Sequence, residues 1–234
     1  MVIQYVRIRW LSLFLCAGIA LLVLAEFLPT RVAIVGQVDT VKKIVALTFD
    51  DGPDPVTTQA LLEVLAKKQV KATFFLLGSQ VEAYPELAAN ITRQGHEVGS
   101  HNYSHVFLNR VSLAEFLEQV GRAEAAISKV APKPVLFRPP GGGYNDKLVE
   151  ELQKRGYTTV LWSVDPRDWE GKTAEATTRF VLKQTKPGSI ILLHEGSCAR
   201  ATPEAVSRII EQLAGQGYSF VTVSELLNLK KQIE

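Results

Sequence analysis

Short apolar runs rich in β-branched and aromatic residues alternate with helical patterns along most of this chain, and no other feature constrains its fold as much. Strands are expected at residues 44–49, 72–76, 96–99, 134–137, 158–163, 190–193 and 218–222. Helices are expected at residues 57–68, 84–94, 112–130, 145–155, 173–185, 202–215 and 224–231. Alternating strands and helices build βα units around a parallel sheet. The pattern therefore predicts an α/β fold, a distorted (β/α)7 barrel whose eighth strand is missing or irregular.

Polar residues that could bind a metal or take part in catalysis follow these predicted strands in a consistent way. The pair Asp50-Asp51, His101, Arg138, Asp165 and His194 all come at or just after the carboxyl end of a predicted strand. In βα-barrels this is the face on which active sites are assembled. We therefore expect these side chains to meet on one rim of the barrel.

The pair Asp50-Asp51 indicates a metal site. Two adjacent carboxylates at the tip of a buried strand are costly, because each must be desolvated while the other repels it. A cation would remove most of that cost, and His101 and His105, four residues apart, are candidate partners. Two imidazoles and one carboxylate are the ligands of a catalytic zinc-type site with one position open for water. The second carboxylate is then free to act as a base.

Simpler interpretations of these residues exist. Asp50-Asp51-Gly52-Pro53 has the composition of an ordinary turn. His101 and His105 would then be two solvated histidines on a surface turn. In the metal-site interpretation, their four-residue spacing places both rings on one side of a helical turn. His96 is expected to be a packed strand residue rather than a third histidine ligand.

The N-terminus has the character of a targeting segment. Arg7 and Arg9 precede an uncharged apolar run from Trp10 to Ala25. A positive flank followed by such a run is typical of secretory targeting. Residues 1–28 are therefore expected to be a signal peptide, cleaved near Ala25, or a membrane anchor, which the length of the run favours. The basic flank would stay cytoplasmic, which places the rest of the chain outside the cytoplasm.

Length and composition limit the remaining possibilities. The chain has 234 residues, enough for one domain with a substantial core. We divide it into the N-terminal segment, a linker at residues 29–40 and a domain at residues 41–234. A net charge of +2 with interspersed signs gives no reason to expect nucleic acid binding. One of the two cysteines, Cys16, lies in the apolar run and the other is Cys198, so a structural disulfide is not expected.

The motifs together resemble a known family. Thr48-Phe-Asp-Asp-Gly-Pro53 resembles the first signature of the polysaccharide deacetylases, carbohydrate esterase family 4, which share the NodB homology domain. His101-x-x-x-His105 is similar to the second signature and Arg138-Pro-Pro-Gly-Gly142 to the third. Asp165-Pro-Arg-Asp-Trp169 is similar to the fourth and Leu192-Leu-His194 to the fifth. The resemblance covers roughly residues 41 to 228, and it implies the same distorted barrel.

The resemblance also implies roles for the polar residues. Asp51, His101 and His105 would hold a divalent metal, zinc or alternatively cobalt. Asp50 would be the catalytic base, and Arg138 would orient it.

His194 would be the general acid, and Asp165 would pair with it, raising its pKa and fixing its orientation. The Gly141 amide would donate to the developing oxyanion. The family commonly has tyrosine at that position, and Tyr144 is a candidate to replace the missing ring. Trp169 and Leu192 are expected to form apolar walls of the substrate site, with core packing as the alternative. Asn102 stands where the family usually has Ser or Thr, and its side chain can still hydrogen-bond a neighbouring backbone group.

The activity expected from this resemblance is metal-dependent removal of N-acetyl groups from N-acetylglucosamine-type residues of a β-1,4-linked polysaccharide. The extracytoplasmic location, as a membrane-anchored or secreted domain, favours peptidoglycan over chitin oligomers. The expected partners are this polysaccharide and, through an uncleaved N-terminus, the membrane; no protein partner is evident. Two alternatives remain: an O-acetyl esterase acting on acetylated xylan, and a catalytically decayed glycan-binding protein tethered to the membrane.

Overall fold

A computed structural model of the chain describes residues 34–231. The expected N-terminal segment, its cleavage site and Cys16 lie outside the described residues. Within residues 34–231, the helices are all too short or too polar to cross a membrane.

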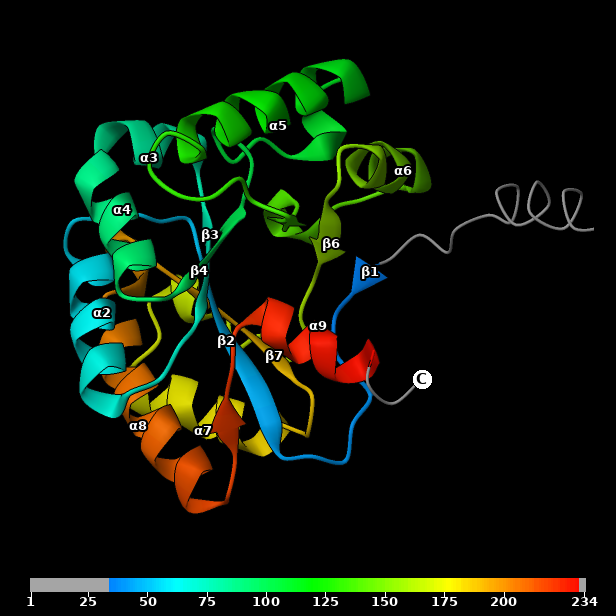
Figure 1. The fold of residues 1–234 in the computed structure, drawn as a ribbon. Coiled ribbons are helices and arrows are strands. Elements are labelled where there is room, and N and C mark those ends of the chain that lie inside the picture. The colour runs from blue at the N-terminus through cyan, green and yellow to red at the C-terminus, as the bar shows by residue number, and fades with distance from the viewer. Residues whose placement is uncertain (1–33, 232–234) are drawn as a thin grey trace, which may run out of the picture. The chain divides into compact units, whose positions relative to one another are not determined.

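The described chain forms a curled, parallel sheet surrounded by helices (Figure 1). The strands are β1 (Ile34–Val35), β2 (Ile44–Asp50), β3 (Thr73–Leu76), β4 (Glu97–Ser100), β5 (Leu136–Phe137), β6 (Thr158–Val160), β7 (Ile190–His194) and β8 (Ser219–Phe220). Their order is β1-β6-β5-β4-β3-β2-β7, and β8 pairs with the start of β2. After β6 the chain turns to β7, where the Leu192 amide donates to the Val164 carbonyl at 2.9 Å. This contact brings the two sides of the sheet together, and the predicted distorted barrel is confirmed.

Helices lie on the outside of the strands. They are α2 (Thr57–Lys68), α3 (Gly78–Ala83), α4 (Pro85–Arg93), α5 (Leu113–Ile127), α6 (Asp146–Lys154), α7 (Ala174–Gln184), α8 (Thr202–Gly215) and α9 (Val223–Lys231). Local sequence sets several of their boundaries. Helix α5, for example, begins with a capping box in which Ser112 Oγ accepts from the Glu115 amide and Glu115 accepts from the Ser112 amide.

Apolar side chains fill the space between the sheet and its helices. Phe49 and Phe74 from adjacent strands pack against each other and belong to one buried cluster with Leu61 and Leu65 of α2 and Ile209 of α8, and all five are fully buried. Burying one such side chain contributes about 1.5–3 kcal/mol. This core holds the strand ends rigidly, so the residues that follow the strands have fixed positions.

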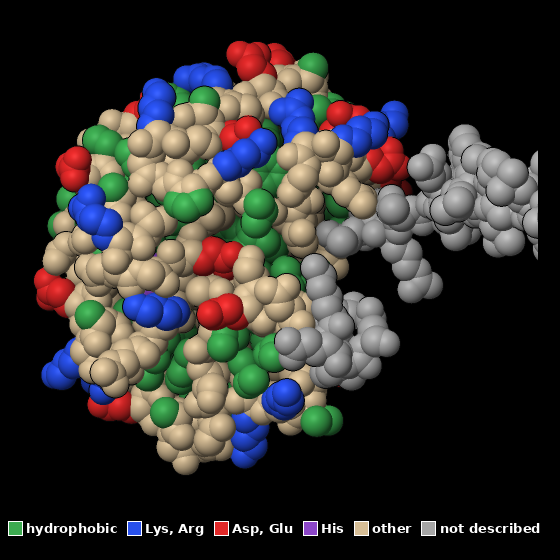
Figure 2. Space-filling model, in the orientation of Figure 1, with side chains coloured by type: hydrophobic (Ala, Val, Ile, Leu, Met, Phe, Trp, Pro, Cys, Tyr) green, Lys and Arg blue, Asp and Glu red, His purple; other side chains and the backbone are tan. Residues whose placement is uncertain are grey.

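Helix α9 covers the amino ends of two strands. Its first amide, of Val223, donates to the Thr73 hydroxyl of β3 at 2.9 Å, and the Ser224 amide donates to Glu97 of β4 at 3.1 Å. On the face of the molecule that carries α9 in Figure 1, basic and acidic side chains intermingle with hydrophobic ones (Figure 2). The carboxyl ends of the strands, where the polar motifs lie, are at the opposite end of the barrel.

Apart from shifts of a few residues at the ends of other elements, the fold differs from expectation at β1, α3 and β6. The connector expected at 29–40 contributes a strand, because β1 pairs with β6. Helix α3 was not expected from the sequence. The strand expected at 158–163 ends at Val160, because the carbonyls of Val160 and Leu161 accept hydrogen bonds from Arg138 at 3.4 and 3.1 Å.

Candidate active site

The expected site residues meet at the carboxyl ends of the strands. Asp50 ends β2, His194 ends β7, and His101 and Arg138 directly follow β4 and β5. A cavity of about 490 Å³ opens at this end. Its lining consists of Asp50, Asp51, His101, His105, Phe107, Gly141, Trp162, Asp165, Trp169, Leu192, His194 and Cys198.

Asp50 and Arg138 form a buried ion pair. Arg138 Nη1 donates to Asp50 Oδ1 at 2.7 Å and to the Thr48 hydroxyl at 2.8 Å. Arg138 is fully buried, and its guanidinium lies 4.1 Å from the centre of the Phe75 ring. Burial alone would raise the pKa of the Asp50 carboxyl, but the positive charge of Arg138, aided by His101 and His194, holds that pKa below its usual value. Asp50 is therefore an ionised carboxylate with a fixed orientation.

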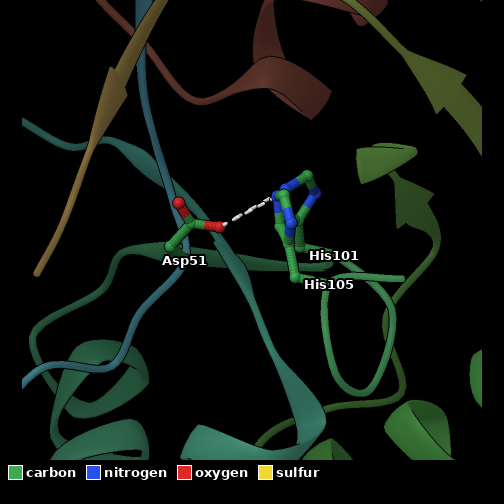
Figure 3. A group of neighbouring side chains, drawn as sticks. All are labelled: Asp51, His101 and His105. Carbon is green, nitrogen blue, oxygen red and sulfur yellow. Dashed lines mark ion pairs between the residues drawn. The ribbon is translucent and has the colours of Figure 1, made fainter. Parts of the chain in front are cut away.

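Asp51 lies next to the two histidines (Figure 3). Its Oδ1 is 3.6 Å from His101 Nε2 and 3.4 Å from His105 Nε2. One ligand atom from each of the three residues falls within 4.8 Å of the others. Burial and the neighbouring His101 ring hold the pKa of His105 below its usual value, against the opposing effect of Asp51 and Asp50.

This group fits a divalent metal. His101 Nδ1 lies 2.7 Å from the Arg138 carbonyl, and because a carbonyl can only accept, Nδ1 carries the proton. The lone pair of His101 Nε2 is then presented to Asp51, whose buried Oδ1 has no hydrogen-bond partner. A backbone carbonyl that fixes the tautomer of a histidine ligand in this way is a common feature of metal sites. A cation among these three groups would satisfy the orphaned oxygen and both rings.

The two histidines come together through a turn rather than a helix, which corrects the expectation for residues 101–105. Asp51, Asn102 and His105 have positive φ angles of 76°, 72° and 58°. Non-glycine residues adopt this conformation at a cost, and such strain is concentrated at functional sites. Asn102 is well suited to its position, because its Oδ1 accepts from the Tyr103 amide at 2.7 Å. The expected hydrogen bond between the Asn102 side chain and a neighbouring backbone group is thus confirmed.

His194 is held by Asp168, and the expected pairing with Asp165 is wrong. Asp168 Oδ1 lies 2.8 Å from His194 Nδ1, and Oδ2 accepts from the His194 amide and from the Thr202 hydroxyl at 2.9 and 2.6 Å. Burial alone would lower the pKa of His194, but the hydrogen bond to Asp168 and the charges of Asp50 and Asp51 raise it. Asp165 instead accepts from the Arg167 amide two residues on, at 2.8 Å. An Asp followed by Pro favours such a local turn, and this signal was available in the sequence.

Gly141 has a positive φ of 62°, and a side chain there would collide with Phe107. A β-carbon at residue 141 would lie 2.7 Å from Phe107 Cε1. Phe107 therefore takes the space beside Gly141, a role that the sequence suggested for Tyr144. Tyr144 lines a neighbouring cavity instead. Nothing in the sequence near residue 107 indicated this contact.

The two expected apolar walls both border the cavity. Leu192 is buried within β7 and pairs in register with Thr48 of β2, so it also packs in the core. Trp169 is 43% exposed and its ring meets that of His194 edge-on at 6.4 Å. Exposure of so large an apolar ring beside the cavity agrees with a contact surface for a ligand.

His96 lies outside the site, as expected. It is buried against Phe74, and its Nδ1 accepts from the Ala72 amide at 3.3 Å. Burial lowers its pKa to about 4.

Glu195 is a buried acid that the sequence did not single out. It follows His194, and its amide donates to the Asp50 carbonyl at 3.0 Å. The side chain is 4% exposed; its Oε2 accepts from the Thr58 hydroxyl and its Oε1 has no partner. A β-carbon on Gly52 would collide with this carboxyl group, so the glycine after Asp51 leaves room for the Glu195 side chain as it lies here.

The chain matches known proteins over most of its length. A family model described as polysaccharide deacetylase matches residues 37–160. A peptidoglycan-N-acetylglucosamine deacetylase of Bacillus cereus is 41% identical over 83% of this chain and 92% of its own length. A peptidoglycan-N-acetylmuramic acid deacetylase of Bacillus subtilis is 42% identical over 84% of this chain, which spans 41% of that relative.

Solved structures agree in fold. A peptidoglycan N-acetylglucosamine deacetylase in complex with a benzamide compound has a TM-score of 0.80 at 36% identity and covers 82% of this chain and 92% of its own. A pseudoenzyme from Bacillus anthracis, of the same carbohydrate esterase family, has a TM-score of 0.76 at 32% identity and covers 83% of this chain and 69% of its own. The comparisons thus include both deacetylases and a pseudoenzyme of the same family.

Proposed function

Because the chain belongs to the polysaccharide deacetylase family, we propose that it hydrolyses N-acetyl groups on N-acetylglucosamine-type residues of a β-1,4-linked polysaccharide, with release of acetate. The observation that carries the proposal is the content of one cavity. It combines a group able to hold a metal, an ionised Asp50 and a histidine held by a buried carboxylate. Together these supply the parts that amide hydrolysis by water requires.

Asp51, His101 and His105 would hold the divalent metal, for which zinc is proposed and cobalt is a substitute. When bound, such an ion polarises a carbonyl group and makes a nearby water molecule more acidic. The orphaned Asp51 Oδ1 and the fixed tautomer of His101 support this assignment.

Asp50 would act as the base. It takes a proton from the water molecule that attacks the acetamide carbonyl carbon. Arg138 keeps Asp50 ionised and prevents the carboxylate from turning away, because it is itself fixed by Thr48 and two backbone carbonyls. The Gly141 amide would donate a hydrogen bond to the oxyanion of the tetrahedral intermediate.

His194 would then donate a proton to the leaving nitrogen, so that the C–N bond breaks and acetate and a free amine form. A raised pKa suits this step, because the ring must be protonated near neutral pH. Asp168 is the positioning residue for His194. No covalent intermediate is needed, so Cys198 is not assigned a role as a nucleophile.

Peptidoglycan is the proposed natural substrate. Two things support it: the extracytoplasmic location that the sequence of residues 1–28 leads us to expect, and the similarity to relatives named peptidoglycan deacetylases. The second candidate function is glycan binding without catalysis, favoured by the similarity to the Bacillus anthracis pseudoenzyme. Against it, each residue of the proposed machinery is present in this chain and has its supporting contact.

The test is acetate release by the purified chain, first stripped of metal and then given zinc or cobalt. The substrates are N-acetylglucosamine oligomers, peptidoglycan and acetylated xylan. Metal-dependent acetate from the amino sugars is expected. Acetate from xylan alone would identify an O-acetyl esterase, and binding without any acetate would identify a glycan-binding protein.

A further inference from the structure

Glu195 touches the segment that carries the proposed base and a proposed metal ligand. It follows His194 at the end of β7, and its amide donates to the Asp50 carbonyl at 3.0 Å. Its side chain is 4% exposed, and the carboxyl group lies against Gly52. The same residue therefore contacts the chain on both sides of Asp51, once through its backbone and once through its carboxyl group.

The Glu195 carboxyl group is fixed by the start of α2. Its Oε2 accepts from the Thr58 hydroxyl, whose oxygen in turn accepts from the Asp54 amide at 2.7 Å. In parallel, the Gly196 amide donates to the Thr57 hydroxyl at 2.8 Å, and this hydroxyl donates to Asp54 at 2.9 Å. These bonds join the turn after β7 to the turn after β2, so the carboxyl group has little freedom to move.

Gly52 is where this carboxyl group meets the segment. A β-carbon on Gly52 would collide with Glu195 Oε1. The φ angle of Gly52 lies outside the left-handed region, so glycine at this position provides room rather than an unusual backbone conformation. The Gly52 carbonyl also accepts from the Leu77 amide at 2.9 Å. The residue after Asp51 is thus held both by the residue that follows β3 and by the Glu195 side chain.

Asp51 depends on such support because its own backbone is strained. A φ angle of 76° is unfavourable for a residue that is not glycine, and it persists only where the surroundings impose it. In this conformation Asp51 Oδ1 lies 3.6 Å from His101 Nε2 and 3.4 Å from His105 Nε2 (Figure 3). A relaxed backbone would turn the carboxylate away from the two rings. The contacts of Glu195 with both neighbours of Asp51 oppose this relaxation.

We propose that Glu195 is a positioning residue for the metal site, and that its carboxyl group holds Asp51 in the conformation that faces His101 and His105. The inference rests on the proposed function, because it takes Asp51 as a metal ligand. It predicts that the shape of the side chain at residue 195 matters. Glutamine has nearly the same shape and can also accept from Thr58, so it should replace Glu195, whereas alanine should not.

The test is the zinc affinity of the metal-stripped full chain, measured by calorimetry after circular dichroism has verified the fold of each variant. Glu195→Ala should weaken zinc binding by ~10–100-fold, the usual effect of losing a group that orients a metal ligand. Glu195→Gln should restore the affinity. Val181→Ala is the control for lost packing, because Val181 is fully buried near the end of α7 and outside the cavity, and it should leave the affinity unchanged. Wild-type affinity in Glu195→Ala, or equal losses in all three variants, would overturn the proposal.

A second pair of variants tests the contact with Gly52. Gly52→Ala places a β-carbon where the Glu195 carboxyl group lies, so it should weaken zinc binding in the wild-type background. In the Glu195→Ala background that space is free, and Gly52→Ala should cost about tenfold less there. Independent effects of the two changes would overturn the proposal. If Glu195→Ala does not fold, Gly52→Ala alone decides, because an unchanged zinc affinity would exclude the contact.

These measurements are separate from acetate release. Zinc binding that depends on Glu195, without acetate from any glycan, would overturn the proposed function and support this inference. Acetate release together with zinc binding that is indifferent to Glu195 would do the reverse. A wild type that binds no zinc would overturn this inference together with the assignment of the metal ligands.

Discussion

Replacement of Glu195 by glutamine should stabilise the protein, and more so as the pH rises. Burial raises the pKa of this carboxyl to about 8; the Thr58 hydroxyl opposes the rise, and the charges of Asp54, Asp51 and Asp50 add to it. In the unfolded chain the same group has a pKa near 4.5. Between these values the folded state keeps a proton that the unfolded state releases. The free energy of unfolding therefore falls as the pH rises from about 4.5 to about 8.

The size of this effect follows from the two pKa values. Relative to low pH, ionisation of Glu195 in the unfolded chain lowers the free energy of unfolding by less than ~1 kcal/mol at pH 5 and by ~4 kcal/mol at pH 8. The change between the two pH values is roughly 3.5 kcal/mol. Glutamine has nearly the shape of the protonated carboxyl group and does not ionise. Glu195→Gln should therefore escape the whole of this pH-dependent loss.

The assay is urea unfolding of wild type and Glu195→Gln at pH 5 and pH 8, with a chelator present in both. The difference in free energy of unfolding between variant and wild type should grow by roughly 3.5 kcal/mol between the two pH values. Glu118→Gln, at an exposed position of α5, is the control and should give a nearly constant difference. A constant difference for Glu195→Gln as well would show that the buried carboxyl does not titrate as argued, and the reasoning would be refuted.

Three further predictions concern the active site. Asp50→Asn should lower kcat by ~10²–10⁴ while glycan binding persists. Because this change leaves the buried Arg138 without its charge partner, circular dichroism should first verify that the variant is folded. Asp168→Asn should lower the pKa of His194 and move the basic limb of the kcat/KM profile to lower pH, whereas Asp165→Asn should not; the opposite pattern would restore Asp165 as the partner. A chelator should lower the Tm of wild type but not of His105→Ala, as calorimetry can measure; equal shifts would exclude His105 as a ligand.

The sequence predicted the scaffold and the rim well, because both depend on local patterns. Helix α2 has the bounds expected from its amphipathic pattern, at residues 57–68. Asp50 and His194 each come directly after an apolar run that predicts a strand. The pattern alone therefore places both residues at carboxyl ends of strands, and so at one end of the barrel. The two-residue strand β1 was missed, because so short a strand is defined by its partner β6 and not by its own pattern.

The details of the site depend on contacts that the sequence does not display. His101 and His105 were assigned to one side of a helical turn, but positive φ angles at Asn102 and His105 bring the rings together in a loop. Choosing between Asp165 and Asp168 required the position of His194, which follows more than twenty residues later. Likewise, the contact between Phe107 and Gly141 joins residues on two separate loops. Tertiary packing decides each of these, whereas local propensity leaves them open.

The proposal on which the others depend is that the chain removes acetyl groups from amino-sugar nitrogens with Asp50 as the base. It is tested most directly by incubating peptidoglycan with metal-loaded wild type and Asp50→Asn and measuring acetate and free amine together. Wild type should release one acetate for each new amine, and the variant should release neither while still binding the glycan. Acetate without a matching amine would mean that an ester, not an amide, is cleaved. Undiminished release by Asp50→Asn would show that Asp50 is not the base and would refute this proposal.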